Sequence, residues 1–243
     1  MSSRRAWLRA ALAMAAASGS RAIAQDRYAV ARENLLREIE SDMRATASDT
    51  GHPALASTVR RALETVPRER FVPTHLAASA YENRPLPIGE GQTISQPFIV
   101  ALMTHLLQPK PDHVVLEVGT GSGYQAAVLA ECVAQVYSIE IVAPLARRAR
   151  EALDAAGYRN VETRVGDGYL GWPEKAPFDG IIVTAAPDHV PPRLIEQLKP
   201  GGRLVIPVGP HRAVQELLVI EKTRDGSSIT RRILAVRFVP LIR

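Results

Sequence analysis

The stretch from Val114 to Tyr124, VVLEVGTGSGY, constrains the fold of this chain more than any other. Its first half is almost continuously apolar, which is typical of a strand buried on both faces of a sheet. Residues 124–133 then place apolar side chains at helical spacing, so the sequence predicts a strand, a tight glycine turn and a helix in that order. Such a turn lies at the carboxyl end of its strand, where glycines let a ligand approach the backbone closely.

The spacing of the glycines indicates which nucleoside cofactor this turn would hold. Gly119, Gly121 and Gly123 form G-x-G-x-G. The dinucleotide fingerprint G-x-G-x-x-G requires its third glycine where this chain has Tyr124. The difference argues against NAD and favours S-adenosylmethionine.

Two further predicted strands end in acidic residues suited to a nucleoside. The strand at 135–139 leads into Glu140, whose carboxylate can accept hydrogen bonds from both ribose hydroxyls. Asp167 lies in a Gly-Asp-Gly turn after a short apolar-alternating run at 161–165, where it can receive the exocyclic amine of an adenine. Each feature alone has a structural alternative, because glycine clusters and acidic strand ends are also ordinary turn residues. Their order and spacing together favour a cofactor site.

The C-terminal half continues the alternation of strands and helices. The predicted elements are a buried strand at 178–183, a helix at 192–198 that stops at Lys199-Pro200-Gly201-Gly202, a strand at 203–207, and strands at 216–221 and 229–239. The last two are joined through an Asp225-Gly226 turn, which favours a hairpin over a crossover helix. The pattern therefore predicts a parallel sheet with an antiparallel C-terminal edge.

The N-terminal part of the body is predicted to be helical. Residues 26–44 and 55–66 each place apolar side chains along one helical face, and these helices are expected to cover one end of the sheet. A Pro- and Gly-bearing stretch at 83–96 then leads toward the cofactor turn. The hydrophobic content of 46% and the length of 243 residues suit one domain with a full core.

Five motifs carry a resemblance to a known family. They are TISQP at 93–97, LEVGTGSGY at 116–124, GDG at 166–168, LKPGG at 198–202 and RFVPL at 237–241. The glycine loop and the KPGG turn recur across methyltransferases, whereas TISQP and RFVPL are far more specific. Over most of residues 60–241 the chain resembles the protein-L-isoaspartate O-methyltransferases.

The resemblance implies a fold, a reaction and a set of site residues. The fold is α/β: a doubly wound, mostly parallel, Rossmann-like sheet of the S-adenosylmethionine-dependent methyltransferase type, with an antiparallel C-terminal edge and an N-terminal helical preface. The enzyme would methylate the α-carboxylate of L-isoaspartyl residues in damaged proteins or peptides, and the ester would collapse to a succinimide, which begins repair. Ser95 is the implied catalytic residue. The implied cofactor-binding residues are Thr93, Ile94, Glu117, Gly119, Thr120, Gly121, Gly123, Glu140, Asp167 and Gly168.

The chemistry of this reaction explains why no catalytic base is expected. A carboxylate has a pKa of roughly 3.3 to 4.3 and is ionised at pH 7, so it attacks a sulfonium methyl unaided. Placement then dominates, and in-line alignment can be worth on the order of 7 to 11 kcal/mol. The hydroxyl of Ser95 could aim the carboxylate by donating to one oxygen. Ser95 also has a compatible structural role as a helix N-cap, because Pro97 and an apolar-periodic run at 98–107 follow it.

Other chemistries have little support in the sequence. The six histidines show no Cys/His spacing for a metal, and His105 and His113 are interpreted as packing or surface residues without a partner pattern. Cys132, the one cysteine, is interpreted as a small buried thiol. No G-x-S-x-G elbow for a serine hydrolase occurs.

The first 24 residues are predicted to be a cleaved export signal. They contain the pair Arg4-Arg5, an alanine-rich run at 10–17 and an Ala-Ile-Ala motif at 22–24, an order typical of twin-arginine signals. An alanine-rich leading helix or an unused upstream start codon are the alternatives. Removing the four arginines of this segment lowers the formal net charge of +5 by four, so the basic composition is no argument for nucleic acid.

These features lead to a set of expectations about organisation and partners. The expected domain spans 25–243, with a helical preface and lid over 25–90 and a cofactor-binding core over 91–243. The location is expected to be periplasmic or otherwise exported, with the cytoplasm as the alternative. We expect a monomer that acts on isoaspartyl proteins and peptides, binds neither metal nor nucleic acid, and has no stable membrane association after signal removal. The alternative functions are a non-catalytic adenosyl-cofactor-binding module and a small-molecule carboxyl methyltransferase.

Overall fold

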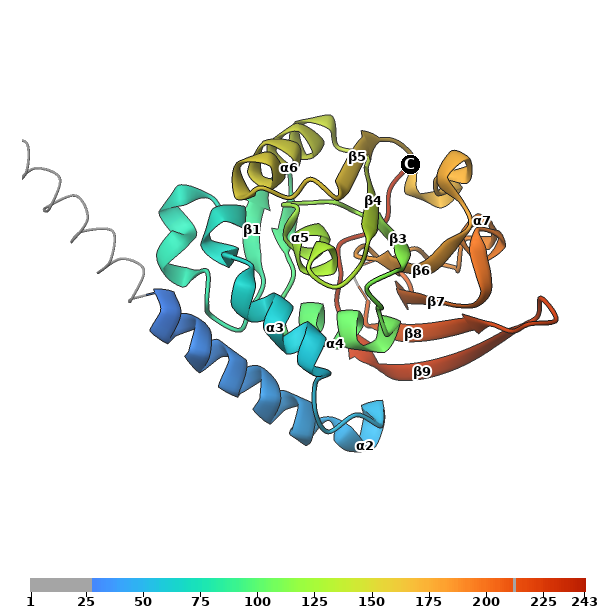
Figure 1. Cartoon of the computed structure of the whole chain (residues 1–243), viewed down its shortest axis with the longest axis horizontal. Coiled ribbons are helices and arrows are strands. Elements are labelled where there is room, and N and C mark those ends of the chain that lie inside the picture. Colours follow the sequence, from blue (N-terminus) through green and yellow to red (C-terminus); the bar gives the residue numbers. More distant parts are fainter. Residues whose placement is uncertain (1–27, 212) are drawn as a thin grey trace, which may run out of the picture.

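The computed structural model of the chain describes residues 28–211 and 213–243, and the predicted signal at 1–24 lies outside them. A seven-stranded sheet forms its centre, in the order β5-β4-β3-β6-β7-β8-β9 (Figure 1). The strands are β3 Val114–Val118, β4 Gln135–Glu140, β5 Val161–Val165, β6 Phe178–Val183, β7 Leu198–Val208, β8 Gln215–Lys222 and β9 Ser228–Val236. The first five of these pair in parallel, whereas β8 pairs antiparallel with both β7 and β9. The predicted parallel sheet with an antiparallel C-terminal edge is confirmed.

Helices cover the two faces of the sheet unequally. The helices are α2 Ala47–Thr50, α3 Ser57–Thr65, α4 Pro97–Leu107, α5 Tyr124–Ala130, α6 Ala143–Ala156 and α7 Pro192–Glu196, and residues 28–45 are helical too. One hydrophobic cluster packs the N-terminal helix and the helices α3, α4, α5 and α6 against one face of the sheet. A second cluster joins α7 and the segment around Trp172 to the other face. Alternate strand residues such as Val115 and Leu116 enter opposite clusters, which is why the strands read as continuously apolar.

The N-terminal helices are part of the same core as the sheet. Leu36 and Ile39 on the first helix and Val59 on α3 are buried in one cluster with Val115 of β3. The expected division between residues 90 and 91 is crossed by a short antiparallel hairpin, β1 Leu86–Gly89 and β2 Gln92–Ile94. The helical preface and the sheet therefore share one hydrophobic core within the described residues.

The segment predicted to stop α7 has a different structure. Leu198 pairs with Phe178 and Arg203 with Gly180, so residues 199–202 form an irregular insertion inside β7 and not a helix stop. A Cβ at Gly202 would lie only 2.9 Å from the carbonyl oxygen of Lys199. The glycine thus allows the backbone to fold tightly on itself within the strand. The helix prediction for 192–198 was therefore too long, because α7 ends at residue 196.

His105 has a partner that sequence reasoning did not find. Its Nδ1 accepts a hydrogen bond from the backbone N–H of Ala56 at 3.0 Å, and its Nε2 lies 3.0 Å from Nδ1 of His52. Burial lowers the pKa of His105 to about 4 and also lowers the pKa of His52, which favours the neutral form of both rings. The pair joins α4 to the segment before α3, which gives His105 the packing role expected for it. Cys132 is buried, and burial raises the pKa of its thiol to about 11.

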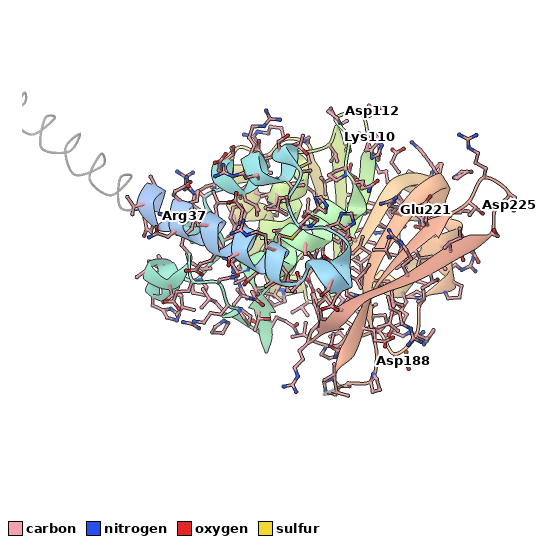
Figure 2. All side chains as sticks on the ribbon, turned by 90° about the horizontal axis from the view of Figure 1, so that it is seen from below. Arg37, Lys110, Asp112, Asp188, Glu221 and Asp225 are labelled. Carbon is pink, nitrogen blue, oxygen red and sulfur yellow. The ribbon has the colours of Figure 1, made fainter. Side chains whose placement is uncertain are left out.

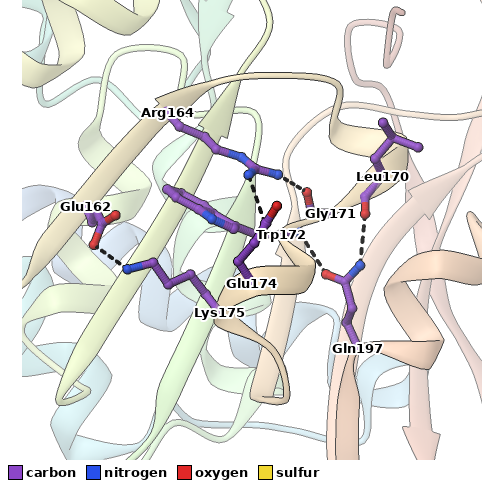
Figure 3. Close-up of polar contacts among 8 residues, drawn as sticks. All are labelled: Glu162, Arg164, Leu170, Gly171, Trp172, Glu174, Lys175 and Gln197. Carbon is purple, nitrogen blue, oxygen red and sulfur yellow. Dashed lines mark hydrogen bonds and ion pairs between the residues drawn. The ribbon is translucent and has the colours of Figure 1, made fainter.

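A corner after β5 closes the second face of the sheet (Figure 3). The guanidinium carbon of Arg164 lies 4.3 Å from the centroid of the Trp172 ring. The same guanidinium donates to the carbonyl oxygen of Gly171 at 2.5 Å and forms an ion pair of 3.3 Å with Glu174. Gln197 accepts a hydrogen bond from the backbone N–H of Trp172 at 2.7 Å. We call Arg164, Gly171, Trp172, Glu174 and Gln197 the β5 corner.

Charged side chains of both signs lie on the periphery of the molecule, on several different elements. Figure 2 shows Arg37 on the first helix, Lys110 and Asp112 before β3, and Asp225 at the tip of the β8–β9 hairpin. Among residues 28–211 and 213–243, none of the helices has the length and apolar composition needed to cross a bilayer. The same residues contain no group of three or more His, Cys, Asp or Glu side chains arranged to hold a metal ion.

Candidate cofactor and acceptor site

The glycine turn after β3 brings bare backbone to the carboxyl edge of the sheet. Gly119 has φ of +98°, and a Cβ there would lie 2.5 Å from Oγ1 of Thr184. That hydroxyl donates to the carbonyl oxygen of Gly119 at 2.6 Å. Gly121 also adopts a positive φ, of +55°. Only glycine fits at position 119, because both the positive φ and the nearby Thr184 side chain exclude a Cβ there.

Glu140 is held in place by the same turn. One carboxylate oxygen accepts a hydrogen bond from the N–H of Gly121 at 2.8 Å, and the other accepts from the N–H of Val142 at 2.9 Å. The side chain is buried to all but 7% of its surface. Each carboxylate oxygen can accept a second hydrogen bond, so two hydroxyl groups can still bind here.

A cleft opens along these elements at the carboxyl edge of the sheet. Eight of the residues proposed from the sequence line it: Thr93, Ile94, Ser95, Gly119, Thr120, Gly121, Glu140 and Gly168. Residues 239–242 complete its wall, and two hydrogen bonds hold them, from Ala186 N to the carbonyl of Val239 and from Leu241 N to the carbonyl of Ala186. We call this cavity the cofactor cleft.

Three of the proposed residues lie near the cofactor cleft without lining it. Glu117 is fully buried beneath the glycine turn and accepts a short hydrogen bond from the hydroxyl of Ser138, which is 2.6 Å from the hydroxyl of Thr120. Burial raises the pKa of Glu117 to about 8, so its carboxyl is largely protonated at neutral pH. Glu117 is thus connected to the cleft through Ser138 and Thr120.

The other two are Gly123 and Asp167. Gly123 is the N-cap of α5 with φ of +87°, and a Cβ there would lie 3.2 Å from Leu153 of α6. Its lack of a side chain therefore lets α5 and α6 pack closely. Asp167 accepts a hydrogen bond from the backbone N–H of Tyr169 at 2.8 Å, which caps a short 3₁₀ helix, η3 Gly168–Leu170.

Ser95 lies between β2 and α4. The N-cap of α4 is Gln96, and its first residue is Pro97, so the expected role of Ser95 as the cap is wrong. The reason is that Pro97 takes the first helical position, which suits its fixed φ, and leaves the residue directly before it as the cap. Ser95 keeps its hydroxyl for another partner.

A second cavity, of about 390 Å³, meets the cofactor cleft at this serine. It is lined by Pro85, Thr93, Ser95, Gln96, Ile99, Thr184, Val214, Ala235, Val236, Arg237, Phe238 and Val239. Thr93, Ser95, Thr184 and Val239 line both cavities. We call these four residues the shared wall and the second space the acceptor cavity. A group held in the acceptor cavity therefore meets a group held in the cofactor cleft at the shared wall.

Thr184 is a site residue that sequence reasoning missed. It directly follows β6, which pairs with β3, so the topology brings it against the glycine turn. Its place after the buried run at 178–183 was an available signal, because ligands of parallel sheets bind at the carboxyl ends of strands.

Comparison with known proteins gives a consistent family. The sequence model of the family described as Protein-L-isoaspartate(D-aspartate) O-methyltransferase (PCMT) matches residues 47–243. A relative named Protein-L-isoaspartate O-methyltransferase 2 from Syntrophobacter fumaroxidans is 58% identical over 226 residues, which cover 93% of this chain and 92% of the relative. A relative of the same name from a Polaromonas species is 58% identical over 207 residues, which cover 85% of this chain and 98% of the relative.

Solved structures agree with the sequence comparison. A protein-L-isoaspartate O-methyltransferase superposes with a TM-score of 0.74 at 29% identity, covering 86% of this chain and 65% of that one. A putative protein-L-isoaspartate O-methyltransferase from Plasmodium falciparum, in complex with S-adenosyl-L-homocysteine, gives a TM-score of 0.71 at 25% identity, covering 88% of this chain and 98% of that one. The resemblance drawn from the five motifs is confirmed: this chain belongs to the protein-L-isoaspartate(D-aspartate) O-methyltransferase family.

Proposed function

We propose that this protein transfers the methyl group of S-adenosylmethionine to the α-carboxylate of L-isoaspartyl residues in damaged proteins and peptides. The observation that carries the proposal is the position of Ser95 on the wall shared by the cofactor cleft and the acceptor cavity. Membership of the family supports the reaction, and the Plasmodium relative in complex with S-adenosyl-L-homocysteine supports the cofactor.

The residues of the cofactor cleft fit an adenosyl group. Gly119 and Gly121 line the cleft without side chains, and a Cβ at Gly168 would lie 2.4 Å from Val118, so the third glycine lets its turn pack closely against β3. Glu140 offers the remaining acceptor capacity of its carboxylate to the ribose hydroxyls. When bound, S-adenosylmethionine supplies an electrophilic methyl group on a sulfonium sulfur. The glycine turn and Glu140 then fix the nucleoside end of the cofactor.

The acceptor cavity can orient a carboxylate that needs no activation. The α-carboxylate of an isoaspartyl residue is ionised at neutral pH, so no residue of the chain has to remove a proton. Ser95 donates a hydrogen bond to one carboxylate oxygen and leaves the other directed at the cofactor cleft. Arg237 adds a positive charge to the wall of the acceptor cavity, which attracts the anionic acceptor. The rate enhancement in this mechanism comes from alignment and from exclusion of water.

Paired peptides test the proposed function. We expect methyl transfer to a peptide that contains one L-isoaspartyl residue and none to the same peptide with L-aspartate, because the side-chain carboxylate of aspartate leaves a differently routed backbone. Equal rates on both peptides would contradict the proposal. Failure on both, together with transfer to free carboxylic acids, would identify a small-molecule carboxyl methyltransferase. Tight binding of S-adenosyl-L-homocysteine without any transfer would identify a non-catalytic binding module.

We also propose that the protein is exported and works as a monomer. The paired Arg4-Arg5 and the Ala-Ile-Ala motif at 22–24 support export. Because S-adenosylmethionine is made in the cytoplasm, an exported enzyme has to carry its cofactor across or receive it outside. Fractionation of the source cell should find a mature form that starts near Gln25 outside the inner membrane, and sedimentation should give the mass of one chain. A cytoplasmic form with residues 1–24 intact would contradict export.

A further inference from the structure

Arg68 is a buried cation beside the proposed site. It opens the 3₁₀ helix η1 Arg68–Phe71 and has no exposed surface. Its Nε donates to the carbonyl oxygen of Ala80 at 2.8 Å, and its Nη2 donates to the carbonyl oxygen of Ser95 at 2.9 Å. Its Nη1 is buried and finds no hydrogen-bond partner among the described residues. One arm of the guanidinium therefore holds the backbone of the proposed catalytic serine.

The charge of Arg68 is not neutralised by an acid in the described part of the chain. Its hydrogen-bond acceptors are two backbone carbonyls, and its guanidinium carbon lies 4.6 Å from the centroid of the Tyr124 ring. Burial lowers the pKa of Arg68 to about 10, which leaves it charged at neutral pH. Burying an unpaired charge costs free energy. An apolar side chain of similar volume would fill the same space without this cost, so packing alone does not explain an arginine here.

Both contacts of this cation lead to the site. Tyr124 is the first residue of α5, directly after the glycine turn, and lines the cofactor cleft. Ser95 belongs to the shared wall. Arg68 lines neither cavity, so it acts on the two ligands through these neighbours and through its field. A buried charge is screened less than an exposed one, so the field of Arg68 extends to the shared wall beside Ser95.

We propose that Arg68 is a positioning residue for the methyl acceptor: its hydrogen bond fixes Ser95, and its unpaired charge draws the acceptor carboxylate to the shared wall. The inference rests on the proposed function. The two effects appear in different kinetic constants. Methyl transfer neutralises the carboxylate, so the charge favours the bound anion more than the transition state and acts mainly on KM. The placement of Ser95 acts on alignment and therefore on kcat.

Two substitutions separate these effects. Arg68→Lys keeps the charge but loses the planar fork that reaches two carbonyls, so we expect kcat to fall about tenfold or more while KM for the isoaspartyl peptide changes less than about threefold. Arg68→Met removes both, and we expect kcat to fall and KM to rise about tenfold or more. The dissociation constant of S-adenosyl-L-homocysteine, measured by calorimetry, should change less than about threefold in both variants.

Arg164 of the β5 corner provides a matched control. Its guanidinium also stacks on an aromatic ring and donates to a backbone carbonyl. Arg164→Lys and Arg164→Met should lower the melting temperature and leave kcat and KM at wild-type values. All variants are assayed at a temperature at which circular dichroism shows them folded. If Arg68→Met does not fold, the lysine variant decides the test, because its kcat should fall while its KM stays within about threefold of the wild-type value.

The outcomes are distinguishable from failure of the proposed function. A wild-type protein that methylates no isoaspartyl peptide contradicts the proposed function. With an active wild type, Arg68 variants that melt at lower temperature but keep wild-type kcat and KM show that the residue is only structural and overturn the inference. A uniform loss of S-adenosyl-L-homocysteine affinity would also overturn it, because Arg68 would then act on the cofactor.

Discussion

Two arginine–aromatic pairs in this molecule have similar local geometry but different surroundings. Arg68 lies over Tyr124 at 4.6 Å and Arg164 over Trp172 at 4.3 Å, and each donates to a backbone carbonyl. Each also leaves one buried nitrogen without a hydrogen-bond partner in the described residues. The side chain of Arg164 is 30% exposed and pairs with Glu174, whereas that of Arg68 is fully buried among uncharged groups.

The difference separates a stabilising contact from a functional one. At the β5 corner, solvent and Glu174 reduce the cost of burying a guanidinium, and the pair ties a loop to the sheet. At the site, the same chemistry leaves a full charge uncompensated next to the wall where an anion is proposed to bind. Parallel substitutions in the two regions therefore report on different properties. Those at the proposed site change affinity or turnover, and those at the β5 corner change stability.

The largest expected difference concerns two glycines. A Cβ at Gly119 would lie 2.5 Å from Thr184 Oγ1, and one at Gly171 would lie 2.3 Å from the amide oxygen of Gln197; both glycines have positive φ. We expect Gly119→Ala to abolish measurable binding of S-adenosyl-L-homocysteine in calorimetry, because the turn must move. Gly171→Ala should lower the melting temperature and keep the affinity. Equal losses of affinity in both variants would remove the distinction between the two regions.

The next effect concerns the hydroxyl of Ser95. Loss of a hydrogen bond to a charged acceptor costs about 1.5 to 3 kcal/mol, which is roughly 10- to 150-fold in rate. Ser95→Ala should therefore lower kcat for the isoaspartyl peptide by such a factor with little change in S-adenosyl-L-homocysteine affinity. Ser122→Ala is the control, since Ser122 lines the cofactor cleft but not the shared wall. Undiminished turnover of Ser95→Ala would exclude the role given to this residue.

An effect no larger than that of Ser95 is expected for two glutamates. Glu140→Ala removes the acceptor proposed for the ribose and should weaken S-adenosyl-L-homocysteine binding by about 1.5 to 3 kcal/mol in calorimetry. Glu174→Ala breaks an ion pair whose carboxylate side chain is 71% exposed, so we expect at most about 1 kcal/mol of stability to be lost and no affinity. If Glu140→Ala retains wild-type affinity, the ribose contact is assigned to the wrong residue.

The last prediction is a pH dependence of stability from Glu117. Its pKa is about 8 in the folded protein, above the value of the unfolded chain, so the folded state binds the proton more tightly. The resulting stabilisation is complete below about pH 4.5 and is lost as the pH rises through about 8. Glu117→Gln keeps a neutral side chain of the same shape and should flatten the melting temperature between pH 6 and 9. An unchanged slope in thermal melts would show that Glu117 is ionised when folded.

The parts of the fold that could be predicted are those whose pattern is local. Residues 178–183 read as a strand because both faces of the sheet are buried there, whereas residues 161–165 read as one because apolar and polar side chains alternate. The glycine turn was recognisable because its backbone needs positive φ. The β1–β2 hairpin was missed because three or four residues carry too little periodicity. The insertion at 199–202 has the residues of a helix stop, and only its pairing with β6 shows that it belongs to a strand.

The role of a site residue could be predicted where the residue directly follows a strand. It could not be predicted where burial determines the charge or the contacts of the side chain. Glu140 lies at the end of its strand and lines the cofactor cleft, as its position in the sequence indicated. Glu117 looked equivalent, but alternation along β3 turns it into the interior, where desolvation changes its charge. Nothing in the sequence around Arg68 distinguishes it from an exposed arginine, because the elements that bury it are distant in the chain.

The wall shared by the cofactor cleft and the acceptor cavity also has a consequence for steady-state kinetics. Two ligands with separate cavities have to be present together for a methyl group to cross between them. Ser95 and Thr184 border both spaces, but the mechanism gives neither of them the methyl group to hold. A covalent methyl-enzyme stage is therefore absent, and double-reciprocal plots at several fixed cofactor concentrations should intersect and not run parallel.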